Sequence, residues 1–363
     1  MPRVPFPPAE SVPGGTGFAR LSRRVRSLIV AGVLFVVLFA LIFSLPVPYV
    51  VLSPGPTYNT LGADDGGRSI IKISGTTVRR TTGNLNLTTV GVNTDSVTPY
   101  QAFVGWLKGD EVVVPRASVY PPGQSQQQTD KQNTQDFVTS QDSAVTAASC
   151  ELGYAKAFGV VSVLADGASA GKLRTGDALV SLDGGDASSA GKLRALLAKT
   201  KAGDTVTVTV RRNGATKEVP VTLSAAPKGQ QGGRLGVSIS DGCLAPFTVD
   251  LGLANQIGGP SAGLMFALGI IDKVGPRDLT KGRFIAGTGT IDPDGTVGPI
   301  GGIQLKMIAA RAKGATVFLA PEDNCDDVRG NVPDGLRVVK VSTLHDAVSD
   351  LEKIEQGQAV PSC

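Results

Sequence analysis

The chain has 363 residues, of which 41% are hydrophobic and 18% charged, and this length suffices for two or three domains with buried cores. A net charge of +4 is too small to indicate nucleic-acid binding, and no basic-aromatic interleaving of the kind that grips single strands occurs. Because the sequence contains a single histidine, serine chemistry in this chain would have to use lysine as its base.

The N-terminal segment predicts a membrane anchor. Residues 1–20 are rich in Pro and Gly without periodicity, and we expect residues 1–26 to form a disordered tail. Residues 27–45 carry no charge, and as a helix they are long enough to cross a bilayer. Residues 46–63 are also uncharged, whereas arginines precede the apolar run at Arg20, Arg23, Arg24 and Arg26. The positive-inside rule therefore places the tail in the cytoplasm and the remaining chain outside, in a single-pass cell-membrane protein.

A cleaved signal peptide is the alternative interpretation of this segment. The apolar region of a signal peptide is usually shorter than residues 27–45, and the following Leu45-Pro46-Val47-Pro48 offers no A-x-A-like cleavage site. We therefore favour the anchor.

All four cysteines lie in the part assigned outside, where disulfides form: Cys150, Cys243, Cys325 and Cys363. Three full pairings are possible, and the sequence does not choose among them. We favour Cys325–Cys363, which would hold the tail at residues 356–363. The cysteine spacing matches no zinc site, and no metal or other cofactor is expected.

Residues 46–140 predict a small, β-rich, membrane-proximal region. An extended connector at 49–61 is followed by strand-like runs at 69–73, 86–92 and 111–114. The polar, Gln-rich stretch at 123–135 is expected to be a loop.

The pattern changes after residue 140. A helix at 141–152 precedes a strand at 159–164, GDALVSLDG at 176–184, a helix at 189–199, GDTVTVTVRR at 203–212 and a strand at 217–223. Residues 141–226 thereby resemble a PDZ domain of the kind found in bacterial envelope proteases.

The PDZ resemblance implies a peptide-binding groove. Such a groove accepts an extended peptide as an added strand beside a helix. The strand containing Gly159 and Val161 and the helix at 189–199 are expected to line it, with Leu152-Gly153-Tyr154 as the carboxylate-binding loop. The alternative is that this surface only packs against neighbouring domains.

The motif GGPSAG at 258–263 follows a turn-rich linker at 227–234 and strands expected at 235–240 and 247–251. Ser261 lies between small residues, and Gly259 and Pro260 form a tight turn ahead of an apolar helix at 264–273. A serine at a helix N-terminus faces amides that favour developing negative charge, as an oxyanion requires.

Lys306 is the candidate base. It opens an apolar helix at 305–313 after PIGGI at 299–303. A lysine accepts a proton only when neutral, so it must be buried in apolar surroundings that lower its pKa.

Residues 232–355 resemble the proteolytic domain of the Lon family of Ser-Lys peptidases. The motifs that carry the resemblance are GPSAG at 259–263, GTGTI at 287–291 and VGPIGGIQLK at 297–306. The resemblance implies that Ser261 is the nucleophile, Lys306 the general base and Thr288 a supporting hydroxyl. The chain departs from many Lon proteins at Gly258, where they have an acidic residue, and at Thr290, where they have Glu.

The resemblance also bears on architecture. No GxxxxGK[ST] motif occurs in the sequence, so no ATP use is expected. Lon-type domains form rings, which implies possible homo-oligomers. The order of anchor, PDZ and proteolytic segment resembles the membrane-anchored PDZ-containing Lon-like proteases. We expect an α/β (α+β) Lon-type domain plus a PDZ domain with one N-terminal transmembrane helix.

Two functions remain open. The first is an ATP-independent endopeptidase that cleaves extracytoplasmic or membrane-protein segments, and the second is a non-catalytic PDZ scaffold on a degenerate peptidase fold. A triad of Ser261, His345 and Asp346 is an alternative catalytic set, although His345 lies where a helix is expected to start.

Overall fold

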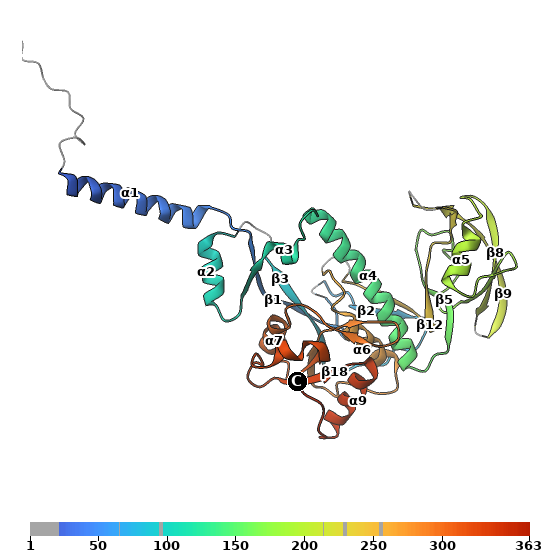
Figure 1. Ribbon diagram of the computed structural model, residues 1–363. Coiled ribbons are helices and arrows are strands. Elements are labelled where there is room, and N and C mark those ends of the chain that lie inside the picture. The colour runs from blue at the N-terminus through green and yellow to red at the C-terminus, as the bar shows by residue number, and fades with distance from the viewer. Residues whose placement is uncertain (1–21, 65, 94–96, 213, 228–230, 254–256) are drawn as a thin grey trace, which may run out of the picture.

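The computed structural model describes residues 22–64, 66–93, 97–212, 214–227, 231–253 and 257–363. Most of the expected tail, residues 1–21, and part of the expected linker, residues 228–230, lie outside the described residues. Helix α1 (Arg23–Ser44) buries none of its residues and projects from a two-part body (Figure 1). Within the described chain, α1 is the one helix that is long and apolar enough to cross a membrane.

The larger part of the body is built on a six-stranded mixed sheet in the order β18-β17-β14-β3-β1-β4. The first four strands run parallel to their neighbours, and β1 is antiparallel to both β3 and β4. The strands span Tyr49–Asn59 (β1), Asn84–Val92 (β3), Val112–Pro115 (β4), Phe284–Gly287 (β14), Val317–Pro321 (β17) and Arg337–Val341 (β18).

Helices cover both faces of this sheet. Successive side chains of a strand point to opposite faces, so Val317 and Leu319 join one buried cluster and Phe318 and Ala320 another. The first cluster packs against α4 (Gln126–Glu151), α6 (Gly263–Val274) and α9 (Leu344–Glu355), and the second against α7 (Ile303–Ala312) and α8 (Cys325–Val328). All five residues of β17 are buried, as is typical of a parallel strand covered on both faces.

The expected membrane-proximal region is not a separate unit in this structure. Its runs at 86–92 and 111–114 are strands β3 and β4, the connector at 49–61 is largely β1, and all three belong to the six-stranded sheet. The run at 69–73 is β2 (Ile71–Ser74), which pairs with β13 (Thr248–Leu251). Strands that are far apart in the sequence pair with one another in these sheets, and the local sequence pattern does not indicate such pairing.

The expected loop at 123–135 is wrong. Helix α4 begins at Gln126, where Ser125 and Gln128 form a capping box. The polar residues of its first turns are mostly exposed. Phe137, Ala144 and Ala148 recur at helical spacing on the face packed against the core, and Ser140, Thr146 and Ser149 are buried as well. The helix therefore extends the one expected at 141–152 toward the N-terminus.

The smaller part of the body has its own core and a sheet in the order β12-β5-β6-β8-β9, with β7 (Gly185–Asp186) paired to β6. Helix α5 (Ala190–Leu197) packs on this sheet through Leu193. The strands span Lys156–Val163 (β5), Ala178–Leu182 (β6), Thr205–Arg212 (β8), Ala215–Thr222 (β9) and Val237–Cys243 (β12). Strand β12, which was expected in the proteolytic domain, thus completes the sheet of the smaller part.

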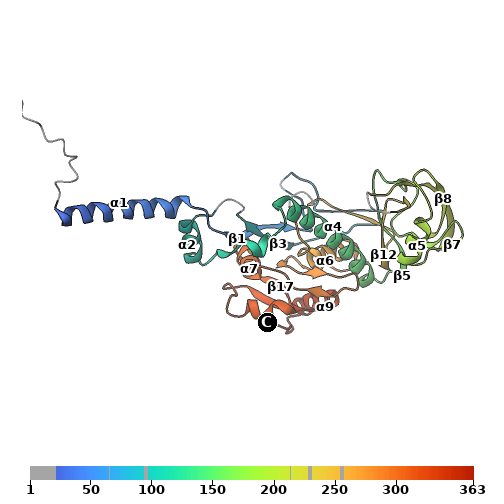
Figure 2. The same ribbon diagram turned by 45° about the horizontal axis from the view of Figure 1, so that its top comes forward.

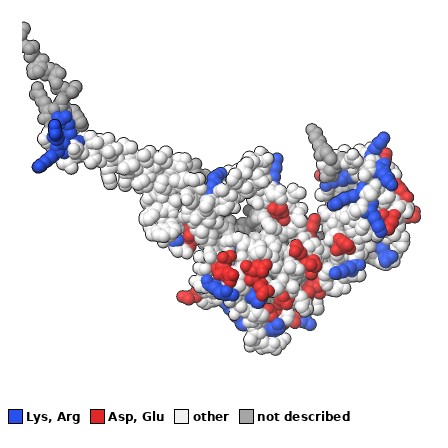
Figure 3. Space-filling view, viewed as in Figure 1, with Lys and Arg blue, Asp and Glu red and all other residues white. Residues whose placement is uncertain are grey.

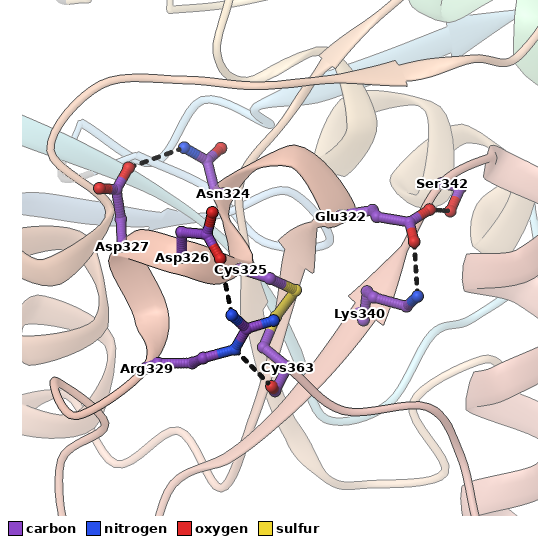
Figure 4. The surroundings of a disulfide bond; sticks show 9 residues. All are labelled: Glu322, Asn324, Cys325, Asp326, Asp327, Arg329, Lys340, Ser342 and Cys363. Carbon is purple, nitrogen blue, oxygen red and sulfur yellow. Dashed lines mark hydrogen bonds and ion pairs between the residues drawn. A yellow bond between two sulfur atoms is a disulfide. The ribbon is translucent and has the colours of Figure 1, made fainter.

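Both parts are tied together by α4 and a disulfide. The bond Cys150–Cys243 joins the last turn of α4 to the end of β12, and Figure 2 shows α4 lying between the large sheet and the smaller part. The second disulfide, Cys325–Cys363, confirms the favoured pairing and holds the C-terminus beside α8 (Figure 4). There Arg329 donates to the carbonyl of Cys363 and pairs with Asp326.

Candidate active site

Ser261 lies two residues before the first residue of α6, as the sequence predicted. Gly259 has a φ of +81°, which a glycine adopts at little cost. Helix α4 holds this turn from the side: the Gly259 amide donates to the carbonyl of Asn133 at 2.8 Å, and the Ser140 hydroxyl donates to that of Pro260 at 2.9 Å. The serine is therefore presented by a turn whose backbone is fixed on both sides of Pro260.

Lys306 reaches the serine from the opposite layer. Its side chain is 3% exposed on α7, and its Nζ lies 2.9 Å from Ser261 Oγ. Burial in the protein lowers the pKa of Lys306 to about 7. The amine is therefore half neutral near physiological pH, as a base that accepts a serine proton must be.

Thr288 links the two residues. It is fully buried directly after β14, its Oγ1 lies 2.9 Å from Lys306 Nζ, and the same hydroxyl donates to the carbonyl of Ser261 at 3.0 Å. The next amide, that of Gly289, donates to this carbonyl as well, at 2.9 Å. Thr288 thus fixes the backbone of the serine and orients the lysine amine. These three residues meet at the carboxyl end of β14, the edge of parallel strands where ligand sites commonly form.

A cavity of about 350 Å³ opens over the pair of Ser261 and Lys306. One wall comes from β3, which continues past the end of β14 and presents Thr88, Thr89 and Val90; Pro56 of β1 lies beside them. These residues were not predicted to belong to the site. Their strand was visible as a pattern, but its place beside β14 depends on pairing across about 200 residues of chain.

His345 does not form a catalytic triad with Ser261. Its Nδ1 bonds Glu151 Oε1 at 2.9 Å, it lines a different cavity, and the pKa of His345 is raised by this carboxylate. Asp346 caps α9 by accepting from the Thr343 amide. The alternative set is therefore contradicted by the geometry.

The predicted peptide-binding residues are placed differently from expectation. Strand β5, with Gly159 and Val161, has β12 on one edge and β6 on the other, so its backbone is not a free edge. Leu152 and Tyr154 pack against the core of the larger part, where the Tyr154 ring meets Phe247, and Gly153 has a φ of +84° in the turn after α4. These residues do not form a groove with α5.

The edge strand that lies next to α5 is β12 instead, and the end of this strand, Gly242 and Cys243, is buried where β12 contacts α4. Strand β12 ends the strand order of its sheet, and its Val237 and Ile239 pack against the core of the smaller part. An extended peptide could add to this edge through main-chain hydrogen bonds. A short polar connector separates β12 from the preceding strands, which hid its membership from sequence patterning.

Among the described residues, no group of three or more His, Cys, Asp or Glu side chains could hold a metal ion. The site residues named above are hydroxyls, an amine and backbone groups, which suit proton transfer and acyl chemistry.

Two family models match the chain. Residues 254–353 match the Lon protease (S16) C-terminal proteolytic domain, and residues 131–223 match the PDZ domain. The chain therefore contains a Lon-type proteolytic domain and a PDZ domain, in a mixed α/β fold. The first match contains Ser261, Thr288 and Lys306 but not β1, β3, β4 or α4, which the structure adds to the same body.

Curated relatives match over the proteolytic segment. Lon protease 1 of Sorangium cellulosum is 37% identical over 94 residues, and Lon protease 2 of Bacillus subtilis is 34% identical over 95 residues. These alignments cover 25% and 26% of this chain but only 11% and 17% of the relatives. The shared segment supports a serine peptidase domain.

Solved structures match over the other domain. The PDZ domain of an SdrC-like protein from Listeria innocua is 28% identical, with 23% of this chain and 92% of that chain covered and a TM-score of 0.21. The corresponding domain from Listeria monocytogenes is 24% identical, with coverages of 24% and 90% and a TM-score of 0.22.

Proposed function

We propose that the chain is a membrane-anchored serine endopeptidase that uses Ser261 as nucleophile and Lys306 as general base. The observation that carries the proposal is the 2.9 Å separation of Lys306 Nζ and Ser261 Oγ, with the amine buried and a cavity open above the pair. A buried neutral amine beside a hydroxyl is the arrangement that activates a serine without histidine.

The reaction follows from these positions. As Ser261 Oγ bonds to the carbonyl carbon of the substrate, the neutral Lys306 amine takes the hydroxyl proton, and negative charge develops on the carbonyl oxygen near the N-terminus of α6. The C–N bond then breaks, and Lys306 returns its proton to the leaving amine. Water attacks the resulting ester and gives its proton to Lys306, and the carboxylic acid leaves as Ser261 regains its hydrogen.

Anchoring and topology are part of the proposal. Helix α1 begins with Arg23, Arg24 and Arg26 and has no buried residues, which supports a single span with the catalytic body outside the cytoplasm. The two disulfides support an oxidising compartment for that body. Because the printed sequence has no P-loop, we propose that cleavage needs no ATP and acts on loops, tails or unfolded segments of extracytoplasmic or membrane proteins.

The PDZ domain would capture such segments along β12. A bound extended peptide should slow amide hydrogen exchange within Val237–Cys243. If excess substrate leaves exchange in β12 unchanged, the capture role is wrong.

The test of the peptidase proposal uses the full chain in proteoliposomes with unfolded casein as substrate. Wild type should release peptides equally with and without Mg-ATP, and Ser261→Ala and Lys306→Ala should not. Equal cleavage by wild type and both variants would contradict the proposal. Absence of cleavage in all three, together with retained peptide binding by β12, would favour the non-catalytic scaffold.

A further inference from the structure

Helix α2 (Pro99–Leu107) carries a stripe of exposed apolar side chains. Tyr100, Phe103, Trp106 and Leu107 are 46%, 57%, 72% and 61% exposed, and their spacing of three and four residues places them along one side of the helix. No residue of α2 is charged. Large apolar groups gathered in this way mark an interaction surface. We call these four residues the aromatic stripe.

The opposite side of α2 is fixed to the catalytic body. Gly105 is the buried residue of the helix, and a side chain placed there would contact Val51 of β1 and Val113 of β4. Thr98 and Gln101 form a capping box at the start of the helix. The stripe therefore faces outward from a helix that is held in place, and not from a frayed segment.

The position of α2 relative to α1 identifies what covers the stripe. The ring of Phe43, in the last turn of α1, lies 4.6 Å from that of Tyr100. A helix of 22 residues is about 33 Å long, close to the ~30 Å thickness of the hydrocarbon core, so Phe43 marks the outer boundary of a bilayer spanned by α1. In both views α2 runs across the direction of α1, as a helix lying in the membrane surface would (Figures 1 and 2).

Composition and charge agree with this position. Tyr and Trp are the residues enriched at the membrane–water boundary, and Lys108, the first charged residue after α2, pairs with Glu111 at 2.6 Å. Figure 3 shows a surface almost without charge that runs from α1 over α2, whereas charges of both signs gather on the lower part of the larger body and on the smaller part.

We propose that the aromatic stripe of α2 inserts into the outer boundary of the bilayer beside α1, so that the catalytic body is held to the membrane at two points. This inference rests on the anchoring of α1 proposed above. Since α2 packs on β1, and β1 pairs with the strand β3 that lines the cavity over Ser261, insertion fixes how that cavity faces the membrane. The accessible substrates are then segments that leave the bilayer close to the enzyme.

The chain supplies its own reporter, because Trp106 is its only tryptophan. The full chain is reconstituted into vesicles of phosphatidylcholine and phosphatidylglycerol, with lipids brominated near the top of the acyl chain as quenchers from the membrane and acrylamide as quencher from water. Trp106 fluorescence should be quenched by the brominated lipid. Its acrylamide quenching should be about threefold weaker than in a Phe103→Ser/Leu107→Ser variant, which loses two contacts with lipid.

Val332→Ser is the matched control, because it removes a 41% exposed apolar side chain from the C-terminal part of the body and should leave both quenching constants unchanged. Strong acrylamide quenching with no effect of brominated lipid would overturn the inference. Shielding from both quenchers that disappears on dilution would also overturn it, in favour of a contact between copies. Flotation of the protein with the vesicles after alkaline washing tests the anchor separately. If the protein floats but Trp106 stays accessible to water, the anchoring of α1 stands and only the insertion of the aromatic stripe is wrong.

Discussion

Among the described residues, two buried lysines lie in the larger part of the body, and their surroundings differ. Lys306 on α7 is 3% exposed and contacts two hydroxyls, those of Ser261 and Thr288, at 2.9 Å. Lys273 on α6 is 8% exposed and donates to the carbonyl of Leu61 at 3.2 Å, next to the carboxylate of Asp272. Both belong to apolar helices, so the sequence context alone hardly separates them.

The charges around the two lysines act differently on their pKa values. Burial is the cause that lowers the pKa of Lys306 to about 7. Burial also lowers the pKa of Lys273, but there the charge of Asp272 acts in the opposite direction and favours the cation. Burial therefore marks a lysine as unusual, whereas a missing countercharge and a neighbouring nucleophile mark it as a base.

The largest expected effect is on catalysis. Lys306→Met should lower the rate of casein cleavage by at least ~10³-fold, because no other base contacts Ser261 Oγ among the described residues. Lys273→Met, which removes a buried amine of the same kind from the other helix, should retain cleavage within a few-fold. Equal losses in the two variants would show that general damage, and not loss of a base, explains the effect.

The second prediction concerns stability and pH. Between about pH 7 and the ordinary lysine pKa of 10.5 the unfolded chain binds a proton at Lys306 that the folded chain does not, so this group makes stability rise with pH in that window. Below pH 7 Lys306 is protonated in the folded chain as well, so the free-energy cost of burying its charge lowers stability in full. At pH 6 the free energy of unfolding of Lys306→Met should therefore exceed that of wild type by on the order of a few kcal/mol, and the variant should unfold at a higher temperature. This difference should close toward pH 10.

Thermal unfolding followed by circular dichroism measures this gap. Lys273→Met should show a smaller pH-dependent component, because Asp272 offsets part of the burial there. A constant difference between wild type and Lys306→Met from pH 6 to pH 10 would mean that Lys306 titrates as an ordinary lysine.

The third prediction separates positioning from chemistry at Thr288. Thr288→Val keeps the shape but removes the hydroxyl that contacts both Lys306 Nζ and the Ser261 carbonyl. It should lower kcat about 10- to 100-fold and shift the midpoint of the pH–rate profile, whereas Thr288→Ser should keep most of the activity. A Val variant with unchanged kcat and unchanged midpoint would remove Thr288 from the site.

The smallest effect is expected at α4. Ser140→Ala loses the hydrogen bond to the Pro260 carbonyl, and cleavage should fall by a few-fold with the pH midpoint unchanged, because the serine turn loosens while the lysine keeps its surroundings. Thr139→Ala, one residue earlier on the exposed side of α4, is the control. A Ser140→Ala variant that cleaves as fast as this control would show that the Asn133 contact alone fixes the turn.

The chemistry-bearing residues could be predicted from the sequence because small residues around Ser261 and the apolar context of Lys306 are local signals. The remainder of the site could not. Thr88 and Val90 enter it through the parallel pairing of β3 with β14, and Asn133 and Ser140 enter through a helix whose first turns are too polar to suggest burial. The place of β12 beside β5 could likewise not be predicted, because no local pattern indicates this pairing.

The central claim is that Lys306 acts on Ser261 as a neutral amine, and its most direct test is the pH dependence of acylation at Ser261. The rate at which an acylating serine reagent labels Ser261 in the full chain would be followed by mass spectrometry from pH 5 to pH 10. The account predicts that the rate rises tenfold per pH unit at low pH, bends near pH 7 and is then constant. A rate that is flat over this range, or that bends only near pH 10, would contradict it.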